Sequence, residues 1–310
     1  MLFCLVVVLV VILVGCAAQN LYTGAVAEIN VDMGSEGDSA STKLEKNLDL
    51  YTNLVAVAKS KGVQILVFPE FGLVPANQDS RESLYPYAEK IGNVDNNNAS
   101  VAALPCDDNS YSDRPILQRM SCAARDNGLA VLVNMVDWID CSSSTDSECP
   151  DDGHYQYNTN VVFDESGRLV VKYHKSHEFP SLRKAYDQVP SPSEVTYQSS
   201  FGVTFGIFTC FDIMFPDPAV NLRKQGISHF LYPVQQGEIG ESTIIQHWSK
   251  SQKATLLSAN LGAGDDRKGD CSGILLNGDD LPSSKVYLRD FNQQYASSAD
   301  NLLIASVPFQ

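Results

Sequence analysis

The chain has 310 residues, of which 44% are hydrophobic and 19% charged, and its formal net charge is −15. This composition is typical of a folded globular protein and excludes an intrinsically disordered chain. A strongly acidic surface repels nucleic acid and anionic lipid, so we expect neither as a partner. No composition break or internal repeat divides the sequence, which therefore predicts one domain.

The first residues of the chain are strongly apolar. Residues 5–14 form an unbroken apolar run, and small residues follow it as far as Ala18. Such a run is too short to cross a hydrocarbon core of ~30 Å, whereas small residues after it are typical of a cleaved secretory signal. We therefore expect a signal peptide over residues 1–18, a mature domain over residues 19–310, and a secreted, extracellular protein with no membrane span. In a bacterium, Cys16 would instead be the lipid-anchored residue of a lipoprotein.

Removal of this leader leaves six cysteines. In an exported protein most of these are expected to be paired. Cys141 and Cys149 flank a short polar loop and predict a local disulfide, and Cys106 with Cys122 is the next natural pair. Six cysteines allow fifteen pairings, so the spacing expresses a preference among them. Asn98 begins an Asn-Ala-Ser glycosylation sequon in an Asn-rich loop, which is consistent with export and with exposure.

Predicted strands and helices alternate along the mature chain. A strand over residues 21–29 precedes a helix with apolar residues at helical spacing from Leu44 to Ala58, and a buried strand follows at residues 63–68. This order predicts a single α/β domain, and a hairpin near its middle makes the sheets mixed. The later elements are helices near 115–127, 218–225 and 243–253, the hairpin strands 160–164 and 168–173, and strands 129–134, 205–210, 228–232, 255–260, 271–277 and 302–307.

Glu70, Lys175 and Cys210 each stand where a predicted strand ends, which is where functional groups of α/β sheets collect. Taken singly, each has an ordinary structural explanation: a capping carboxylate, a surface lysine and a core cysteine. Together they suit acyl transfer. A carboxylate can take the thiol proton, and a nearby ammonium favours the thiolate and stabilises the oxyanion that develops on an attacked carbonyl.

The segments that contain these residues resemble the three signature segments of the nitrilase superfamily, in that family's order. They are Phe68-Pro69-Glu70, Tyr173-His174-Lys175 and Gly206-Ile207-Phe208-Thr209-Cys210-Phe211-Asp212. Residues 81–87, 152–160 and 215–220 are similar to segments of the vanin and biotinidase branch. The resemblance covers nearly the whole mature chain and implies a four-layer α-β-β-α sandwich.

The resemblance also implies an activity. Cys210 would be the nucleophile that forms a thioester with the acyl half of the substrate, Glu70 the general base and Lys175 the cationic stabiliser. Relatives in this branch hydrolyse amides of pantetheine or biotin derivatives, which implies a small linear secondary amide as substrate, no metal and no organic cofactor. We expect the protein to be a monomer or a homodimer. The residues expected to contact substrate are Phe211, Asp212, Gln235 and Gln236.

Two segments depart from the family's pattern. The family carries a second glutamate a short distance after the lysine, whereas an ungapped match places Leu182 there, and Glu178 lies nearer the lysine. Gln235 and Gln236 stand where the branch has an aromatic stretch, so pantetheine specificity is not expected to transfer unchanged. Two alternatives stay open: a nitrilase-fold binding or photoprotein-like protein without amide turnover, with Cys271 as a chromophore-carrying thiol, and a nitrile hydrolase.

Overall fold

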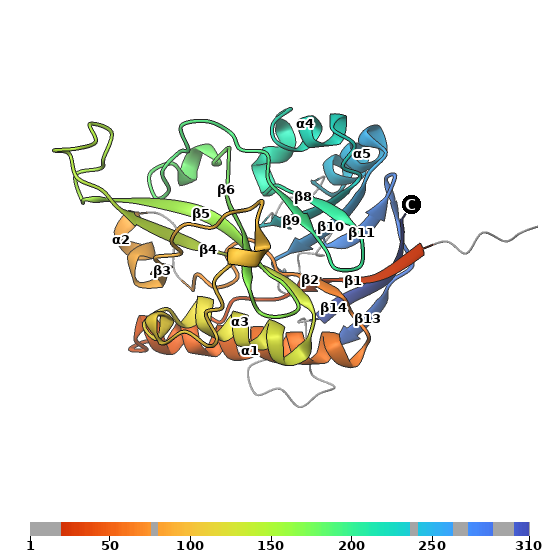
Figure 1. Cartoon of the computed structure of the whole chain (residues 1–310), viewed down its shortest axis with the longest axis horizontal. Coiled ribbons are helices and arrows are strands. Elements are labelled where there is room, and N and C mark those ends of the chain that lie inside the picture. The colour runs from red at the N-terminus through yellow and green to blue at the C-terminus, as the bar shows by residue number, and fades with distance from the viewer. Residues whose placement is uncertain (1–19, 76–79, 236–240, 263–271, 288–300, 310) are drawn as a thin grey trace, which may run out of the picture.

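Two β-sheets lie face to face between two layers of helices in the computed structural model of the chain (Figure 1). The structure describes residues 20–75, 80–235, 241–262, 272–287 and 301–309. The predicted signal peptide, Gln236 and Cys271 lie outside these ranges.

The larger sheet has eight strands and carries two helices on its outer face. Within it β1 pairs in parallel with β2 and antiparallel with β14, so the sheet is mixed, as predicted. In spatial order its strands are β13 (Ser284–Tyr287), β14 (Asn301–Phe309), β1 (Asn20–Glu28), β2 (Ile65–Val67), β4 (Ala130–Asp140), β5 (His154–Phe163) and β6 (Leu169–His174), with β3 (Ala88–Glu89) paired to β4. Its helices are α1 (Ala40–Ser60) and α3 (Pro115–Asn127), and the one-turn helix α2 (Arg81–Leu84) precedes β3.

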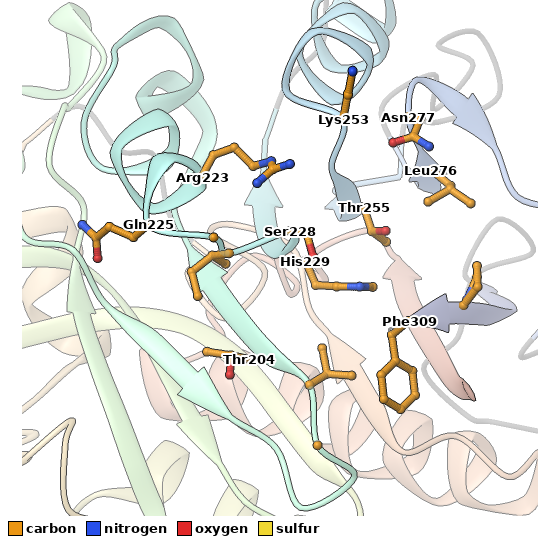
Figure 2. A pocket seen from close by; sticks show the side chains of 15 residues that line it. Thr204, Arg223, Gln225, Ser228, His229, Lys253, Thr255, Leu276, Asn277 and Phe309 are labelled. Atoms are coloured by element: carbon orange, nitrogen blue, oxygen red, sulfur yellow. The ribbon is translucent and has the colours of Figure 1, made fainter. Parts of the chain in front are cut away.

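The smaller sheet has six strands, and its central strands β8, β9 and β10 are parallel. A pocket of about 690 Å³ lies at the amino ends of these three strands (Figure 2). In spatial order the strands are β12 (Asp279–Asp280), β11 (Gly273–Leu276), β10 (Thr255–Asn260), β9 (His229–Val234), β8 (Thr204–Ile207) and β7 (Thr196–Gln198). Its outer face carries α4 (Ala219–Lys224) and α5 (Glu241–Gln252).

Three clusters of buried apolar side chains fill the spaces between the four layers. Successive side chains of a strand point to opposite faces, so one strand supplies two clusters. Ile65 and Val67 of β2 pack between the sheets, whereas Leu66 packs with the residues of α1 and α3. On the other side, Phe230 of β9 packs with Trp248 of α5. The four-layer α-β-β-α sandwich predicted from the resemblance is confirmed. Within the described ranges, no helix is both long and apolar enough to span a bilayer.

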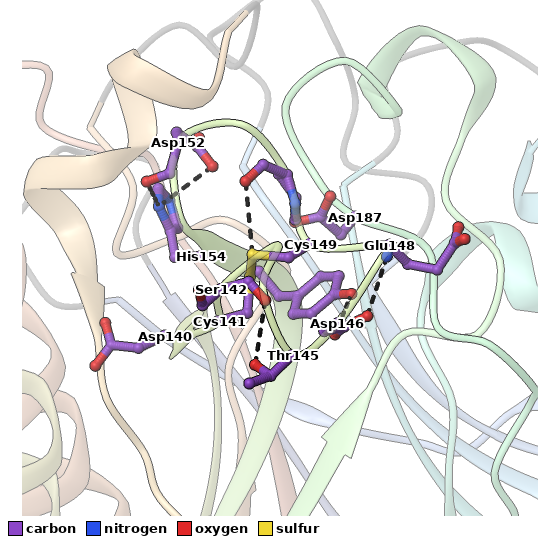
Figure 3. Close-up of a disulfide and its surroundings, with 12 residues drawn as sticks. Asp140, Cys141, Ser142, Thr145, Asp146, Glu148, Cys149, Asp152, His154 and Asp187 are labelled. Atoms are coloured by element: carbon purple, nitrogen blue, oxygen red, sulfur yellow. Dashed lines mark hydrogen bonds and ion pairs between the residues drawn. A yellow bond between two sulfur atoms is a disulfide. The ribbon is translucent and has the colours of Figure 1, made fainter.

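Strands β4 and β5 form a hairpin that is much longer than the sequence predicts. Their pairing runs from Val131 opposite Phe163 to Asp140 opposite His154. The outer half was not recognised as strand because polar residues interrupt its apolar pattern. At the hairpin's tip Cys141 forms a disulfide with Cys149 (Figure 3).

A second disulfide joins Cys106 to Cys122 on α3. Both disulfides are those expected from the spacing of the cysteines.

Candidate active site

Glu70, Lys175 and Cys210 come together from both sheets, as expected. Glu70 follows β2, Lys175 follows β6, and Cys210 opens a 3₁₀ helix (Cys210–Met214) after β8. Glu70 and Lys175 are 0% and 2% exposed, and the Lys175 ammonium donates to Glu70 Oε1 across 2.7 Å. Two opposite charges at this distance and depth form a direct ion pair.

The backbone of Gln235, just beyond β9, connects Glu70 with Cys210. Its N–H donates to Glu70 Oε2 across 3.1 Å, and its carbonyl oxygen lies 3.8 Å from Cys210 Sγ. The Gln235 side chain is exposed. The predicted substrate-contacting residue Gln235 therefore stands at the site, while its partner Gln236 lies outside the described residues.

Cys210 is held in a backbone conformation that non-glycine residues seldom adopt, with a φ of 44°. Such a conformation persists only where the surroundings fix it. Here the Thr209 N–H donates to Asp212 Oδ2 across 2.9 Å, and the Asp212 N–H donates to the Thr209 carbonyl oxygen at the same distance. The buried Tyr232 hydroxyl donates to the Cys210 carbonyl oxygen across 2.9 Å. These bonds set the direction in which the thiol leaves the chain.

Asp212 ties the cysteine turn to the segment that carries Lys175. Its carboxylate is fully buried and also accepts from the Tyr173 hydroxyl at 2.7 Å and the His177 N–H at 2.8 Å. Both of its oxygens therefore face protein donors. Phe211 is half-buried and packs edge-to-face against Phe179 at 5.2 Å between ring centroids.

A chain of buried carboxamides links Glu70 with the cysteine turn. Asn158 donates to Glu70 Oε1 across 2.8 Å, and Asn160 donates to Thr209 Oγ1 across 2.7 Å. Asn134 on β4 donates to the oxygens of both amides. Sequence reasoning assigned no role to these asparagines. The available signal was the pair of asparagines two residues apart, which share one face of a strand.

Glu178 is a fourth ionisable residue at the site. It is 1% exposed, and its Oε2 lies 3.5 Å from the Lys175 ammonium. Neither carboxylate oxygen has a hydrogen-bond partner within the part of the chain that the structure describes. Leu182, the residue found where the family carries its second glutamate, packs against the apolar cluster of α1 and α3 instead. In this chain Glu178, which lies nearer Lys175 in the sequence, places a second carboxyl group beside the ammonium.

The buried charges compete for one ammonium. Burial opposes the charged form of Lys175, but the carboxylates of Glu178 and Glu70 outweigh it and hold the pKa of Lys175 well above its usual value. Burial raises the pKa of Glu178 to about 8, although the Lys175 charge acts against this shift. Lys175 therefore stays charged at neutral pH, whereas Glu178 carries a proton for most of the time.

Cys210 is 8% exposed, and burial together with the nearby Glu70 charge raises the pKa of its thiol well above the usual value. The Lys175 ammonium lowers this pKa without offsetting the rise. The ammonium therefore favours the thiolate, as expected, but burial and the Glu70 charge outweigh it and the thiol is protonated at rest. The sequence shows that the lysine is present but cannot show that Glu70 already neutralises it.

The other predicted residues are the disulfide cysteines and the glycosylation sequon at Asn98. Cys210 is the free cysteine of the described part, because the other four described cysteines form the two disulfides. Asn98 is exposed and begins a short 3₁₀ helix (Ala99–Val101), so the sequon lies at the surface, as expected.

The profile of the family described as carbon-nitrogen hydrolase matches residues 26–260. Pantetheinase from Bos taurus is 38% identical over 230 residues, which make up 72% of this chain and 43% of that protein. Biotinidase from Takifugu rubripes is 36% identical over 256 residues, or 79% of this chain and 50% of that protein. The matched part of the chain thus spans half or less of these relatives.

Solved structures show the same fold. A mutant of the Nesterenkonia AN1 amidase, from the nitrilase superfamily, superimposes with a TM-score of 0.61, covering 93% of this chain and 90% of that one. The two sequences are 18% identical, so this likeness bears on the architecture alone.

Proposed function

The chain belongs to the carbon–nitrogen hydrolase family, as the resemblance predicted, and we propose that it is an amidase whose nucleophile is Cys210. The observation that carries the proposal is the buried ion pair of Glu70 with Lys175 beside the one free thiol of the described residues. We propose a small linear secondary amide as substrate, since the curated relatives include a pantetheinase and a biotinidase.

In the first half-reaction the thiol is protonated at rest, so proton removal accompanies attack. Glu70 accepts the proton as Sγ bonds to the carbonyl carbon, and the electron pair of the carbonyl moves to its oxygen. The Lys175 ammonium stabilises this oxyanion. When the carbon–nitrogen bond breaks, Glu70 returns the proton to the leaving amine, and Cys210 keeps the acyl group as a thioester.

The second half-reaction consumes one water. Glu70 takes a proton from this water as its oxygen attacks the thioester carbon, and the carbon–sulfur bond breaks as the acid leaves. The proton then returns to the thiolate. One amide and one water give one acid and one amine, and all three catalytic groups return to their starting state.

The residues around this trio have distinct proposed roles. Asp212 is buried with both oxygens bonded to protein donors, which supports positioning of the Cys210 turn in place of the substrate contact expected from the sequence. Glu178 is a second positioning residue, which limits where the Lys175 ammonium can lie. Phe211 and Gln235 retain their proposed contact with substrate, as does Gln236.

We also propose that the protein is secreted after removal of residues 1–18. The two disulfides support an oxidising compartment, because such bonds are rare in reducing ones. The exposed sequon at Asn98 is a glycosylation site under this proposal.

The proposal is tested by replacing the nucleophile. Purified wild-type protein incubated with pantetheine or a biotinyl amide is expected to release free amine, and Cys210→Ala is expected to lose this activity at least about 10³-fold. The melting temperature of the variant should stay close to wild type, because one thiol at a strand end is removed.

Two results of this assay contradict the proposal. Turnover by Cys210→Ala would exclude the cysteine as nucleophile. Ammonia release from an aliphatic nitrile, with no amine released from any amide, would identify the nitrile hydrolase alternative. The alternative without turnover rested on Leu182 and Gln236, and the buried Glu178 carboxylate beside Lys175 weakens the part that rested on Leu182.

A further inference from the structure

The pocket at the amino ends of β8, β9 and β10 lies at the opposite end of the strands from Cys210. Thr204 and His229 begin β8 and β9 and line the pocket, whereas Cys210 and Gln235 follow the carboxyl ends of these strands. β9 has six residues, so about 20 Å of strand separates the two places. The pocket volume of about 690 Å³ is within the range of small-molecule sites.

Positive charge lines this pocket. Among the described residues its lining includes Arg223 and Lys253 but no aspartate or glutamate, although the whole chain has a net charge of −15. Neither residue forms an ion pair with any described residue. The Arg223 Nε donates to the Gln252 carbonyl oxygen across 2.7 Å, which fixes the guanidinium at the pocket's edge and leaves its terminal nitrogens available. Figure 2 shows Arg223 reaching from α4 toward His229 and Thr255.

His229 adds a hydrogen-bond donor to the floor of the pocket. It is 7% exposed, and its Nδ1 lies 3.1 Å from the hydroxyl of the buried Tyr22. Burial lowers the pKa of His229 to about 4, so the imidazole is neutral at neutral pH. In the tautomer that accepts at Nδ1 from the Tyr22 phenol, the imidazole proton lies on Nε2 and can be donated to a ligand.

Apolar side chains also line the pocket. They include Phe309 at the end of β14, Leu276 at the end of β11 and Val203 before β8. A guanidinium fork suits the paired oxygens of a carboxylate or a phosphate, and an apolar wall suits a hydrocarbon or aromatic group attached to them. The pocket thus combines cationic with apolar side chains and suits a ligand that has both an anionic and an apolar part.

We propose that this pocket binds a small amphipathic anion, an oxyanion head group joined to a short apolar body, independently of the site at Cys210. Arg223 and Lys253 attract the head group, and His229 and Thr255 orient it. The apolar body covers Phe309. Because Lys253 is exposed and Arg223 is half-buried, binding weakens as ionic strength rises.

The proposal is tested by calorimetric titration of the purified full chain with octanoate, phenyl phosphate, inorganic phosphate and 1-octanol. The first two probes are expected to bind saturably with one site per chain. Inorganic phosphate, which lacks the apolar body, and 1-octanol, which lacks the charge, are each expected to bind at least about tenfold more weakly, equivalent to about 1.4 kcal/mol.

Variants separate this pocket from other sites. Arg223→Gln is expected to weaken octanoate binding about tenfold, whereas Lys224→Gln, which removes the same charge from the next residue of α4 outside the pocket, should leave it unchanged. If Arg223→Gln does not fold, the exposed Lys253→Gln gives the same test. Cys210→Ala should bind octanoate as the wild type does.

Three results overturn the proposal. One is equal binding of octanoate and 1-octanol, and another is an equal effect of Arg223→Gln and Lys224→Gln. The third is loss of octanoate binding in Cys210→Ala, which would place the anion at the proposed nucleophile. Hydrolysis assays on the same samples report on the proposed amidase separately, so the two proposals fail independently.

Discussion

The two ends of the smaller sheet treat charge in opposite ways. Beyond the carboxyl ends of its strands, Cys210 meets a buried lysine that is paired with one carboxylate at 2.7 Å and approached by a second at 3.5 Å. At the amino ends, Arg223 and Lys253 line an open pocket without any carboxylate. Burial makes an unpaired charge costly, so charges inside the fold are matched, while those at a solvent-filled pocket need not be.

Among the changes that test this comparison, replacement of the proposed general base Glu70 should have the largest effect on activity. Glu70→Gln keeps the size of the side chain but removes the group that accepts the thiol proton, and we expect the rate of amide hydrolysis to fall about 10²- to 10⁴-fold. Glu45→Gln on the exposed face of α1 is the matched control and should retain full activity. Activity of Glu70→Gln equal to that of the control would remove Glu70 from the mechanism.

Removal of the shared cation should cost the most stability. Lys175→Met leaves the Glu70 carboxylate buried without a partner charge, and we expect the free energy of unfolding at pH 7 to fall by about 3–5 kcal/mol. Chemical denaturation measures this loss. The control is Lys253→Met at the other end of the sheet, where the ammonium is exposed and unpaired, and it should change the stability little. Similar losses in both variants would show that the contrast between the two ends is wrong.

The buried Glu178 should make the free energy of unfolding depend on pH. Its folded-state pKa of about 8 lies above the ordinary value of 4.5, so between these limits the folded protein holds a proton that the unfolded chain has released. This group therefore makes the free energy of unfolding fall as pH rises from 4.5 to 8. Glu178→Gln should reduce that decline, as measured by denaturation at pH 5, 6.5 and 8. An unchanged slope would mean that Glu178 is already ionised at pH 5.

His229, at the other end of the sheet, should change the free energy of unfolding with pH in the opposite direction and by a smaller amount. Its folded-state pKa of about 4 lies below the ordinary value of 6.5, so the unfolded chain binds a proton in this window and the folded protein does not. Stability is fully present above pH 6.5 and falls as pH decreases toward 4, by up to about 3 kcal/mol. His229→Gln should flatten this part of the profile relative to wild type. A steeper acid loss in the variant would contradict the assignment of a neutral imidazole.

Much of the architecture could be predicted because it depends on short-range patterns. The run at residues 63–68 is apolar apart from Gln64, and its centre, Ile65–Val67, forms β2 between two clusters of core residues. Glu70, Lys175 and Cys210 could be selected for a related reason, since each stands at the end of such a strand within a recognisable motif. The outer hairpin was missed because its buried polar residues find partners far away in the sequence, as Asn134 does with Asn158 and Asp137 with His174, which no local pattern reveals.

The electrostatics of the site could not be predicted from the sequence. The protonated resting thiol follows from burial and from the contact of Lys175 with Glu70, two residues far apart in the chain. The sequence shows that Glu178 lies nearer the lysine than the family's second glutamate, but whether its carboxylate faces the ammonium depends on the fold of the loop after β6. The pocket near His229 combines segments from six different strands and helices, and no motif marks it.

Mass spectrometry of the acyl-enzyme tests the central claim most directly. Wild-type protein is mixed with pantetheine or a biotinyl amide, quenched in acid within the first turnovers and digested. We predict that the peptide containing Cys210 gains the mass of the acyl group minus one hydrogen, and that Cys210→Ala shows no such gain on any peptide. An acyl group on a different residue, or rapid turnover with no adduct on Cys210 under any quench time, would contradict the account.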